Sequence, residues 1–456
     1  TGRTQRVVAF LLGLPSGSSF SSDANYLASA VTSSSGLSME VSWTRLYYLS
    51  AVHVLSALNI EVDDGSELVA PPRLVVQGTT LTMRGTLRGV SQLAIGDGGA
   101  VDLVATGNSN GSAVGVFAFD VVTLDGRAVS DGGETASLTL QDQAALVMSE
   151  MSVVHGTVFV NGRVDVNAST LNLTSSGSFD GKGRTTRATT TGPGTPETTG
   201  CTWITNDYGR DRAASHGGVG GKAGSGCLYG STFEPVTEGS SGHGGLGGAA
   251  LRLTVTGDLH MSGTITVDAG DASTDFSGGS GGSAWISAGV LRGSGGIVRA
   301  DGGTRNRYGN AGGGGGRIAL YCDTSEYVGV GEHGLALPGM HAYGGEGSDD
   351  AWDGACGTVY VDCGRVTKTL LLDNNNRDAS PQTTYLVDSG MTTYAFDTVQ
   401  LDGKAKAGFA PTNAGTSAVT VSIGNATGDK TGTLVLEPFT GRTQRVVAFL
   451  LGLPSG

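Results

Sequence analysis

The chain has 456 residues, a formal net charge of −13 and only 15% charged residues. Its 78 glycines are accompanied by only 11 prolines and no Gly-X-Y period, which excludes collagen, and the 38% apolar content argues against a disordered chain. The acidic balance argues against a nucleic-acid partner, and no apolar run reaches the roughly eighteen residues that cross a bilayer.

The chain opens and closes on the same segment. Residues 1–17 read TGRTQRVVAFLLGLPSG, and residues 440–456 read the same. Self-similarity at a fixed period indicates a repeat array, so we predict a 439-residue unit followed by the start of the next one. A duplicated tag is the alternative, but tags are seldom so apolar. Because no Met begins the chain and no signal segment precedes it, we expect the natural N-terminus elsewhere.

Residues 1–67 are predicted to form a junction or capping segment. One stretch within them has a helical spacing of apolar residues: residues 38–60, SMEVSWTRLYYLSAVHVLSALNI. Its sequence does not decide between a helix and strands.

Residues 68–180 alternate short apolar segments, such as LVV, LTM, LAI and VFV, with Gly, Asn or Asp turns. This spacing is typical of a sandwich, a barrel or a parallel β-helix. Residues 117–128 and 394–405 are identical at eight of twelve positions (FAFDVVTLDGRA and YAFDTVQLDGKA), which indicates an older duplication. Their shared Asp-Gly suits a hairpin turn or a β-helix corner, and the neighbouring spacing favours the corner.

Residues 181–240 interrupt this pattern, because they are rich in Thr, Gly and Pro and include Cys201 and Cys227. We expect a loop insertion, which could be a linker, an O-glycosylated stalk or an excursion over one face of the fold that a cysteine pair ties down.

Four alternating segments recur in residues 241–370, and three of them directly follow glycine-rich tracts. They are ALRLTV at 250–255, AWISA at 284–288, RIALYC at 317–322 and TVYVDC at 358–363. Aligning Leu251, Ala284, Ile318 and Val359 gives spacings of 33, 34 and 41 residues. We predict one coil of about 25–40 residues whose strands stack as a parallel sheet, with glycine at the corners. A second strand follows in each coil, at 264–267 and 296–299, before a DAGD or ADGG turn. Residues 371–439 are predicted to continue this architecture, and residues 440–456 to begin the next repeat.

The segments at 278–286, 312–321 and 354–361 (GGSGGSAWI, GGGGGRIALY and GACGTVYV) resemble the Gly-rich parallel β-helix repeats of giant extracellular proteins. Such repeats occur in bacterial surface proteins and in algal or protist proteins of flagellar-hair or mastigoneme type. The resemblance implies an all-β fold, a parallel β-helix of the usual right-handed connection, and an extracellular or cell-surface location, for example on a flagellar or ciliary appendage. It implies no catalytic residues.

The five cysteines of a β-rich chain suggest an oxidising compartment. Cys322 and Cys363 end two aligned segments in the same register, so stacked strands would place their Cα atoms about 4.8 Å apart, within disulfide range. We predict this disulfide, with a ladder of reduced thiols as the alternative. Cys201 and Cys227 form the natural second pair, which leaves Cys356 free or intermolecular.

Two metal sites can be considered from the sequence. Calcium could bind the acidic turn of Asp349, Asp350 and Asp353, although ordinary turn aspartates are the simpler interpretation. A zinc site lacks any Cys-x-x-Cys spacing, and its candidate ligands are Cys201, Cys227, His216 and His243.

Glycosylation sequons occur at Asn110, Asn167, Asn172 and Asn425. They would be used only in a secreted chain, which the resemblance favours. His53, His155 and His260 lie in apolar stretches and are expected to be strand residues rather than ligands.

We expect a structural protein rather than an enzyme: a repeat unit of an extracellular filament or surface appendage, with itself as partner and no cofactor except, at most, calcium. The first alternative is an adhesin or glycan-binding stalk that uses exposed Trp203, Trp285 or Trp352. The second is a polysaccharide lyase or hydrolase, whose candidate residues are Asp349, Asp350, Asp353, His333 and His341.

Overall fold

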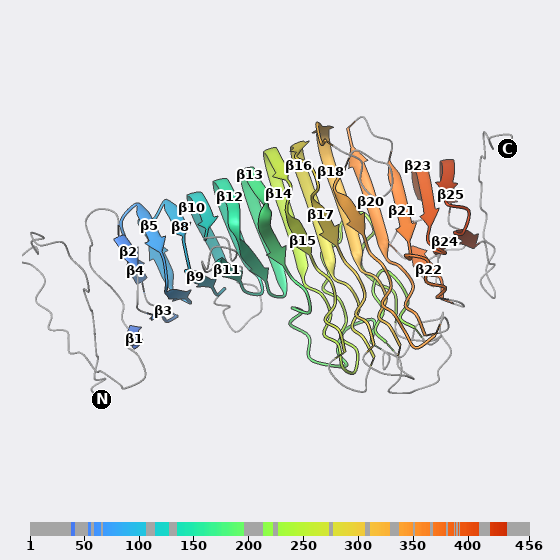
Figure 1. The fold of residues 1–456 in the computed structure, drawn as a ribbon, viewed down its shortest axis with the longest axis horizontal. Coiled ribbons are helices and arrows are strands. Elements are labelled where there is room, and N and C mark those ends of the chain that lie inside the picture. Colours follow the sequence, from blue (N-terminus) through green and yellow to red (C-terminus); the bar gives the residue numbers. More distant parts are fainter. Residues whose placement is uncertain are drawn as a thin grey trace, which may run out of the picture. The chain divides into compact units, whose positions relative to one another are not determined.

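The computed structural model shows an all-β chain, as predicted, with no helix among the residues that it describes. The described residues are 38–41, 53–55, 59–64, 67–105, 115–126, 135–195, 213–221, 227–272, 277–305, 311–328, 337–349, 352–364, 368–379, 382–386, 388, 391, 393–409 and 420–435. The chain divides into two compact units, residues 1–159 and 160–456, and each is described by itself (Figure 1).

The first unit consists of parallel strands in two alternating ladders and one short pair. Its strands are β1 (Ser38–Val41), β2 (His53–Leu55), β3 (Asn59–Val62), β4 (Glu67–Val69), β5 (Arg73–Val76), β6 (Thr80–Met83), β7 (Thr86–Arg88), β8 (Gln92–Ile95), β9 (Ala100–Leu103), β10 (Gly115–Asp125), β11 (Ala136–Leu140) and β12 (Ala144–Val160). One ladder runs β2–β5–β8–β10–β12 and the other runs β1–β3–β6–β9–β11, while β4 pairs with β7.

The core of the first unit is a stack of apolar side chains in register. Leu74, Leu93, Val122 and Met151 are successive Cα partners, and each is at most 1% exposed. Stacking removes nearly all of their apolar surface from water, which is the main stabilising contribution of such a core. The coil from Leu74 to Leu93 is only 19 residues long, shorter than the predicted 25–40 residues. It is short because only two short strands, β6 and β7, lie between β5 and β8.

The second unit repeats the arrangement with longer strands. They are β13 (Arg163–Asp180), β14 (Ala250–Met261), β15 (Thr264–Thr266), β16 (Ser283–Arg292), β17 (Ile297–Arg299), β18 (Arg317–Ser325), β19 (Gly339–His341), β20 (Thr358–Cys363), β21 (Thr369–Asp373), β22 (Thr384–Leu386), β23 (Thr393–Asp402), β24 (Lys406–Phe409), β25 (Thr420–Gly428) and β26 (Thr433–Val435). The parallel ladders are β13–β14–β16–β18–β20, β13–β15–β17–β19, β21–β23–β25 and β22–β24–β26.

The register of this unit confirms the alignment predicted from the sequence. Leu251 pairs with Ala284, Ala284 with Ile318, and Ile318 with Val359. All four side chains are at most 2% exposed and define the inner face of the sheet. The second strands also pair as expected, because β15 forms a parallel pair with β17.

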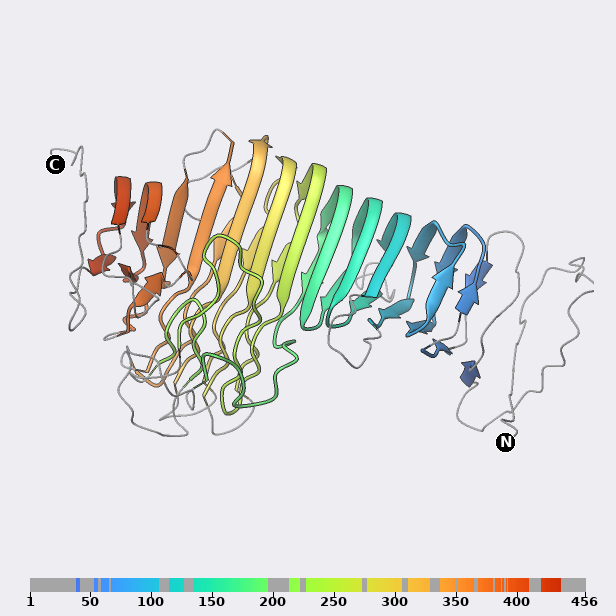
Figure 2. The same cartoon turned by 180° about the vertical axis from the view of Figure 1, so that it is seen from behind.

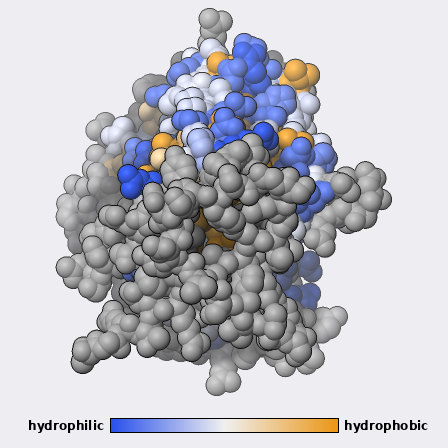
Figure 3. All heavy atoms as spheres, turned by 90° about the vertical axis from the view of Figure 1, so that its left-hand side faces the viewer, coloured by the Kyte–Doolittle hydropathy of each residue, from blue (hydrophilic) through white to orange (hydrophobic). Residues whose placement is uncertain are grey.

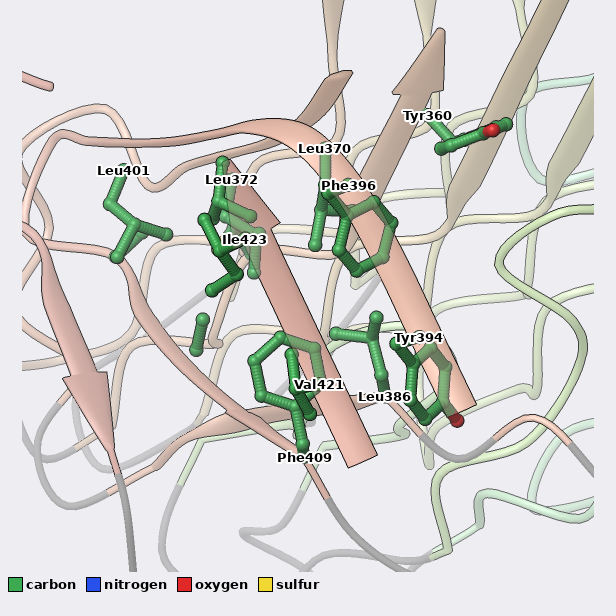
Figure 4. Packing of buried hydrophobic residues seen from close by; sticks show 14 of the residues in the cluster. Tyr360, Leu370, Leu372, Leu386, Tyr394, Phe396, Leu401, Phe409, Val421 and Ile423 are labelled. Carbon is green, nitrogen blue, oxygen red and sulfur yellow. The ribbon is translucent and has the colours of Figure 1, made fainter. Parts of the chain in front are cut away.

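The parallel order is interrupted between β20 and β21, which pair antiparallel. Tyr360 is the Cα partner of Leu370, so both side chains lie on the outer face, opposite Val359. From here the buried apolar cluster continues on the face of Tyr360, opposite Val359, and combines side chains of the β21–β23–β25 and β22–β24–β26 ladders, among them Leu372, Leu386, Phe396 and Val421 (Figure 4). The sequence did not predict this change of face.

Two open questions from the sequence are answered. The two related segments FAFDVVTLDG and YAFDTVQLDG lie in β10 and β23, which pair parallel with their neighbours. Their Asp-Gly pairs therefore mark corners rather than hairpins, as preferred. The stretch with a possible helical spacing contains β1, β2 and the first two residues of β3, so its described residues are strands.

The surface offers few apolar side chains. Figure 3 shows mostly hydrophilic described residues on the face it draws, with isolated hydrophobic ones. The exposed large apolar residues of the described chain are Val116, Val147, Leu246, Ile297 and Val328. Within the described ranges, no helix is long and apolar enough to cross a membrane.

Candidate functional site

The glycine-rich tracts of the second unit form a hydrogen-bonded bundle of extended, non-strand segments. In Figure 1 and Figure 2 these segments run side by side beyond the ends of the strands. The bundle contains residues 181–195, 213–221, 227–248, 267–272, 277–282, 300–305, 311–316, 342–349 and 352–357.

The backbone donors of residues 312–316 show a period of three. The N–H groups of Gly312 and Gly315 donate to one neighbouring segment, at Trp352 and Ala355. Those of Gly313 and Gly316 donate to a second segment, at residues 303 and 300, and that of Gly314 donates to a third, at residue 214. A chain with three residues per turn is of polyproline II type, whose backbone groups point outward to neighbours. A β-strand has neighbours on two sides, whereas this segment has them on three.

Only glycine fits at many of the contacts of this bundle. A Cβ atom on Gly313 would lie 1.7 Å from the carbonyl oxygen of Gly279, and one on Gly314 would lie 2.0 Å from that of Gly218. Both distances are far below any allowed contact. Of the two reasons predicted for glycine at the corners, close backbone approach accounts for most glycines of these tracts, whereas positive φ does not. The tracts also form extended segments rather than short corners.

The segment at residues 227–240 attaches the bundle to the sheet through a buried arginine. Arg317, at the start of β18, is completely buried, and its Nε donates to the carbonyl oxygen of Tyr229 at 2.9 Å. Its Nη1 donates to the hydroxyls of Thr232 (3.0 Å) and Thr358 (3.2 Å). Burial lowers the pKa of Arg317, and the nearby carboxylate of Asp388 acts in the opposite direction.

Asp388 holds the same segment from the other side. Its Oδ1 accepts hydrogen bonds from the hydroxyl of Ser231 at 2.8 Å and from the N–H of Thr232 at 2.5 Å. Arg317 and Asp388 thus fix adjacent parts of one loop, in a region where both charges are removed from water. A buried charge of this kind requires compensation by an opposite charge and by hydrogen bonds, and this loop supplies the hydrogen bonds.

His216 joins three segments of the bundle. It is completely buried, its Nδ1 lies 2.7 Å from the carbonyl oxygen of Gly281, and its Nε2 lies 2.8 Å from the hydroxyl of Thr237. The carbonyl can only accept, so Nδ1 donates and Nε2 accepts. Burial, with a contribution from Arg317, lowers the pKa of His216 to about 3. The ring stacks on Tyr229 at 4.4 Å between centroids and is a neutral cross-link.

Phe233 covers the outer face of the sheet. Its ring meets Tyr360 edge-on at 4.8 Å between centroids and lies 6.0 Å from Phe396, while its carbonyl oxygen accepts a hydrogen bond from the hydroxyl of Tyr321 at 2.9 Å. The described parts of residues 181–240 contain no strand and pack closely on the fold. In these parts the segment packs on the fold, as the excursion alternative expects and a free linker or stalk does not, while the cysteine pair that would tie it down stays a prediction.

Aspartates at the strand ends connect successive coils. Oδ1 of Asp268 accepts from the N–H of Asp301 at 2.8 Å, and Oδ1 of Asp301 accepts from the N–H of Tyr343 at 2.8 Å and lies 2.9 Å from His341 Nδ1. Burial raises the pKa of Asp268, and the neighbouring Asp301 raises it further, while Arg299 opposes both. Each carboxylate thereby fixes the register of the next coil.

The predicted disulfide between Cys322 and Cys363 is present, with the two Cα atoms 4.3 Å apart on in-register strands. Cys356 is free and only 1% exposed, so its thiol does not reach a second chain as it stands. Cys227 is disulfide-bonded, but Cys201 lies outside the described residues, so the pairing of these two stays a prediction.

The zinc hypothesis is contradicted, because both ring nitrogens of His216 are engaged and Cys227 is in a disulfide.

The residues considered for calcium do not share one environment. Asp353 is buried and accepts a hydrogen bond from the N–H of Gly347 at 2.6 Å, whereas Asp349 is exposed. Three candidate residues lie outside the described residues: Asp350, His333 and the zinc candidate Cys201. In the described ranges no group of three or more His, Cys, Asp or Glu side chains could hold a metal ion. Calcium binding therefore stays a prediction without an assembled site.

The residues considered for polysaccharide chemistry are engaged separately. His341 contacts Asp301 and stacks on Tyr343 at 4.2 Å, and Asp353 closes its own turn. His155 lies 3.3 Å from Asp125, and His260 is an exposed residue of β14, as expected of strand positions. The side chain of His53 lies outside the described residues.

Three of the four sequons can be located. Asn167 is half-buried and Asn172 is exposed, both on β13, and Asn425 is exposed on β25. Asn110 lies outside the described residues. All three lie on strands rather than in loops. The side chains of Asn167 and Asn172 alternate with buried ones and so point out of the core, whereas Asn425 lies in an exposed run at the end of β25.

The tryptophans do not form one patch. Trp285 is half-buried on the outer face of β16, where the guanidinium of Arg252 lies 4.3 Å from its ring centroid, whereas Trp352 belongs to the bundle. Trp203 lies outside the described residues. Neither Arg252 nor Arg317 was singled out from the sequence, because their partners lie at least 33 residues away in the chain.

Comparison of the chain with protein-family models, with curated proteins and with solved structures finds no match. The function is therefore inferred from the sequence and the geometry of this chain.

Proposed function

We propose that the chain is a structural repeat of an extracellular filament or surface appendage, in which a right-handed parallel β-helix continues from one repeat into the next. The alternating ladders support this architecture, because a chain that returns to the same two ladders in turn must wind around a common core. Right-handed connection is the usual hand for parallel strands.

The position of the last strands is the observation on which this proposal depends. Among the described residues, β25 pairs only with β23, and β26 pairs only with β24. Within that part of the chain each of the two strands therefore has a neighbour on one side only, and residues 440–456 come after them with the same sequence as residues 1–17. An unpaired edge is a template for a further strand. We propose that the apolar segment VVAFLLGL extends one of these ladders and so joins successive repeats.

The internal contacts suit a load-bearing role. The Cys322–Cys363 disulfide joins adjacent coils covalently, the bundle adds hydrogen bonds in three directions, and the arginine of β18 fastens the excursion to the sheet. Disulfides persist mainly outside the cytosol, which supports the extracellular location.

Electron microscopy of native material tests the proposal. We expect filaments with an axial repeat that corresponds to one 439-residue unit. Monodisperse particles without an axial repeat would contradict it.

A further inference from the structure

An unsatisfied polar site lies on the outer face of the second unit, beside one of the sequons. Asp165 on β13 and Arg252 on β14 are Cα partners, and Arg252 is the Cα partner of Trp285 on β16. The three side chains therefore form a row across the sheet, with about 4.8 Å between neighbouring strands. We call this row the Asp–Arg–Trp row.

The two charged members of this row do not satisfy each other. Asp165 and Arg252 form no ion pair within the described chain, and the Oδ1 atom of Asp165 is buried without a hydrogen-bond donor. The guanidinium of Arg252 lies over the Trp285 ring, and no described residue accepts a hydrogen bond from it. Stacking on the ring holds the planar cation in one place and leaves its N–H groups available.

Arg292, a neighbouring arginine on the same sheet, differs from Arg252 because its charge is compensated. Arg292, on β16, contacts the carboxylates of Asp258 and Glu326 and so has its charge compensated. Arg252 is presented in the same sheet without such a partner. A carboxylate oxygen that needs a donor and a guanidinium that needs an acceptor, on adjacent strands, match the neighbouring hydroxyl groups of a sugar ring, since each hydroxyl both donates and accepts.

The sequon supplies such a sugar at the right place. Asn167 is two residues from Asp165 on β13, so both side chains point to the outer face about 7 Å apart. Asn167 is the Cα partner of Thr254, two residues beyond Arg252. A sugar on the amide of Asn167 therefore starts within one ring's length of the Asp–Arg–Trp row.

We propose that Asn167 bears an N-linked glycan whose first sugars bind the Asp–Arg–Trp row of the same chain. In the transfer, Nδ2 of Asn167 loses a proton and bonds to the anomeric carbon of an oligosaccharide, while the lipid pyrophosphate of the donor leaves. Asp165 then accepts a hydrogen bond from a sugar hydroxyl, Arg252 donates to another, and Trp285 holds the guanidinium. The inference rests on the extracellular location in the proposed function but not on filament assembly.

The test compares three sequons of one secreted protein. The full chain is produced in a eukaryotic secretory host, which supplies the glycosylation machinery whether or not the chain forms filaments. The native protein is treated with peptide N-glycosidase, and site-resolved mass spectrometry follows release at each Asn. We expect release at Asn167 to be about tenfold slower than at Asn172 and Asn425, which corresponds to a contact of about 1.4 kcal/mol. In the denatured protein the three rates should be equal.

Two variants distinguish slow release caused by binding to the Asp–Arg–Trp row from slow release caused by poor access of the enzyme to Asn167. Arg252→Gln, which keeps the side-chain length, should bring release at Asn167 to the rate of the other sites. Arg292→Gln removes an outward arginine of the same sheet and should leave the difference intact. An unoccupied Asn167, a native release rate equal to that of Asn172, or no effect of Arg252→Gln in a folded protein would overturn the proposal.

Discussion

Single glycines in the bundle act through the absence of a side chain rather than through unusual dihedral angles. At Gly313, Gly314 and Gly357 a Cβ atom would lie 2.0 Å or less from a carbonyl oxygen of a neighbouring segment. Because that oxygen belongs to the backbone, the whole segment would have to shift. The bundle therefore depends on residues that a sequence reader would assign to flexible turns.

The substitution Gly313→Ala tests this requirement, and Gly270→Ala is its control. Around Gly270 the nearest atom to an added Cβ is 3.5 Å away, an ordinary contact, and neither glycine has a positive φ. We expect Gly313→Ala to lower the free energy of unfolding by about 3 kcal/mol, as overpacking does in a closely packed interior. Gly270→Ala should leave it within about 1 kcal/mol of the wild type, because alanine reduces the entropy of the unfolded chain. Chemical denaturation measures both, and equal effects would contradict the packing argument.

His216 makes the stability of the second unit depend on pH. Its folded pKa of about 3 lies below its ordinary value of 6.5, so the unfolded chain binds the proton more readily. The contribution of the neutral ring is complete above pH 6.5 and is lost as the pH falls toward 3. The loss from this residue is about 4 kcal/mol at pH 3 relative to pH 7.

We expect His216→Gln to reduce the fall in unfolding free energy between pH 7 and pH 3, compared with the wild type. Glutamine can donate to the carbonyl oxygen of Gly281, and it does not titrate. Ser283→Ala is the control, because it removes a nearby buried hydrogen bond to the carbonyl of Thr237 but no titratable group. That variant should lower stability equally at all pH values. An identical pH slope in His216→Gln and wild type would show that the ring is not buried as described.

Which residues could be predicted from the sequence depends on how local their signal is. Cys322 and Cys363 end two similar segments, so the alignment of those segments predicted their contact. Arg317 could not be recognised, because Tyr229 and Thr232 approach it from a loop more than 80 residues away. His216 was considered only as a metal ligand, since nothing near it in the sequence shows that Gly281 and Thr237 surround its ring.

At the level of elements, the disulfide joins β18 to β20 where the parallel stack is about to end. Beyond β20 the chain reverses into the antiparallel β21, and the buried apolar cluster continues on the face of Tyr360. A covalent link at this point holds the last coil before the reversal against its neighbour. Phe233 from the excursion covers the apolar outer face at the same place.

Removing this disulfide by Cys322→Ala with Cys363→Ala should destabilise the second unit by about 4 kcal/mol, because the bond closes a loop of 41 residues. The double substitution leaves the disulfide of Cys227 intact, which a reducing agent would not. Cys356→Ala is the control for loss of a buried thiol without loss of a bond. Chemical denaturation under non-reducing conditions measures all three proteins. A double variant as stable as Cys356→Ala would contradict the expectation.

The parallel ladders could be predicted from the sequence because each strand alternates apolar and polar residues and recurs at a similar interval. The bundle could not be predicted, because a glycine tract has no side-chain pattern that reveals its direction or its neighbours. The antiparallel pairing of β20 with β21 was missed for a related reason: the short segment between the two strands contains a single glycine, Gly364, at positive φ. A single turn residue does not distinguish a corner from a reversal.

At the scale of the molecule, the decisive feature is that the last described strands, β25 and β26, each pair with a described strand on one side only. The described ladders of the second unit end in β25 and β26, and the sequence beyond them begins the repeat again. A solenoid whose terminal coil is open to solvent is unstable without a cap, and a second repeat stacked on that coil provides one. Continuity from repeat to repeat is therefore the central claim.

A chain with two complete copies of residues 1–439 and then residues 440–456 tests that claim most directly. Cryo-electron microscopy of this protein should show the strand ladders running without interruption from β25 and β26 of the first copy into the strands of the second, with VVAFLLGL as a strand at the junction. Two copies that adopt variable orientations about a flexible junction, with β25 and β26 still unpaired on one side, would contradict it.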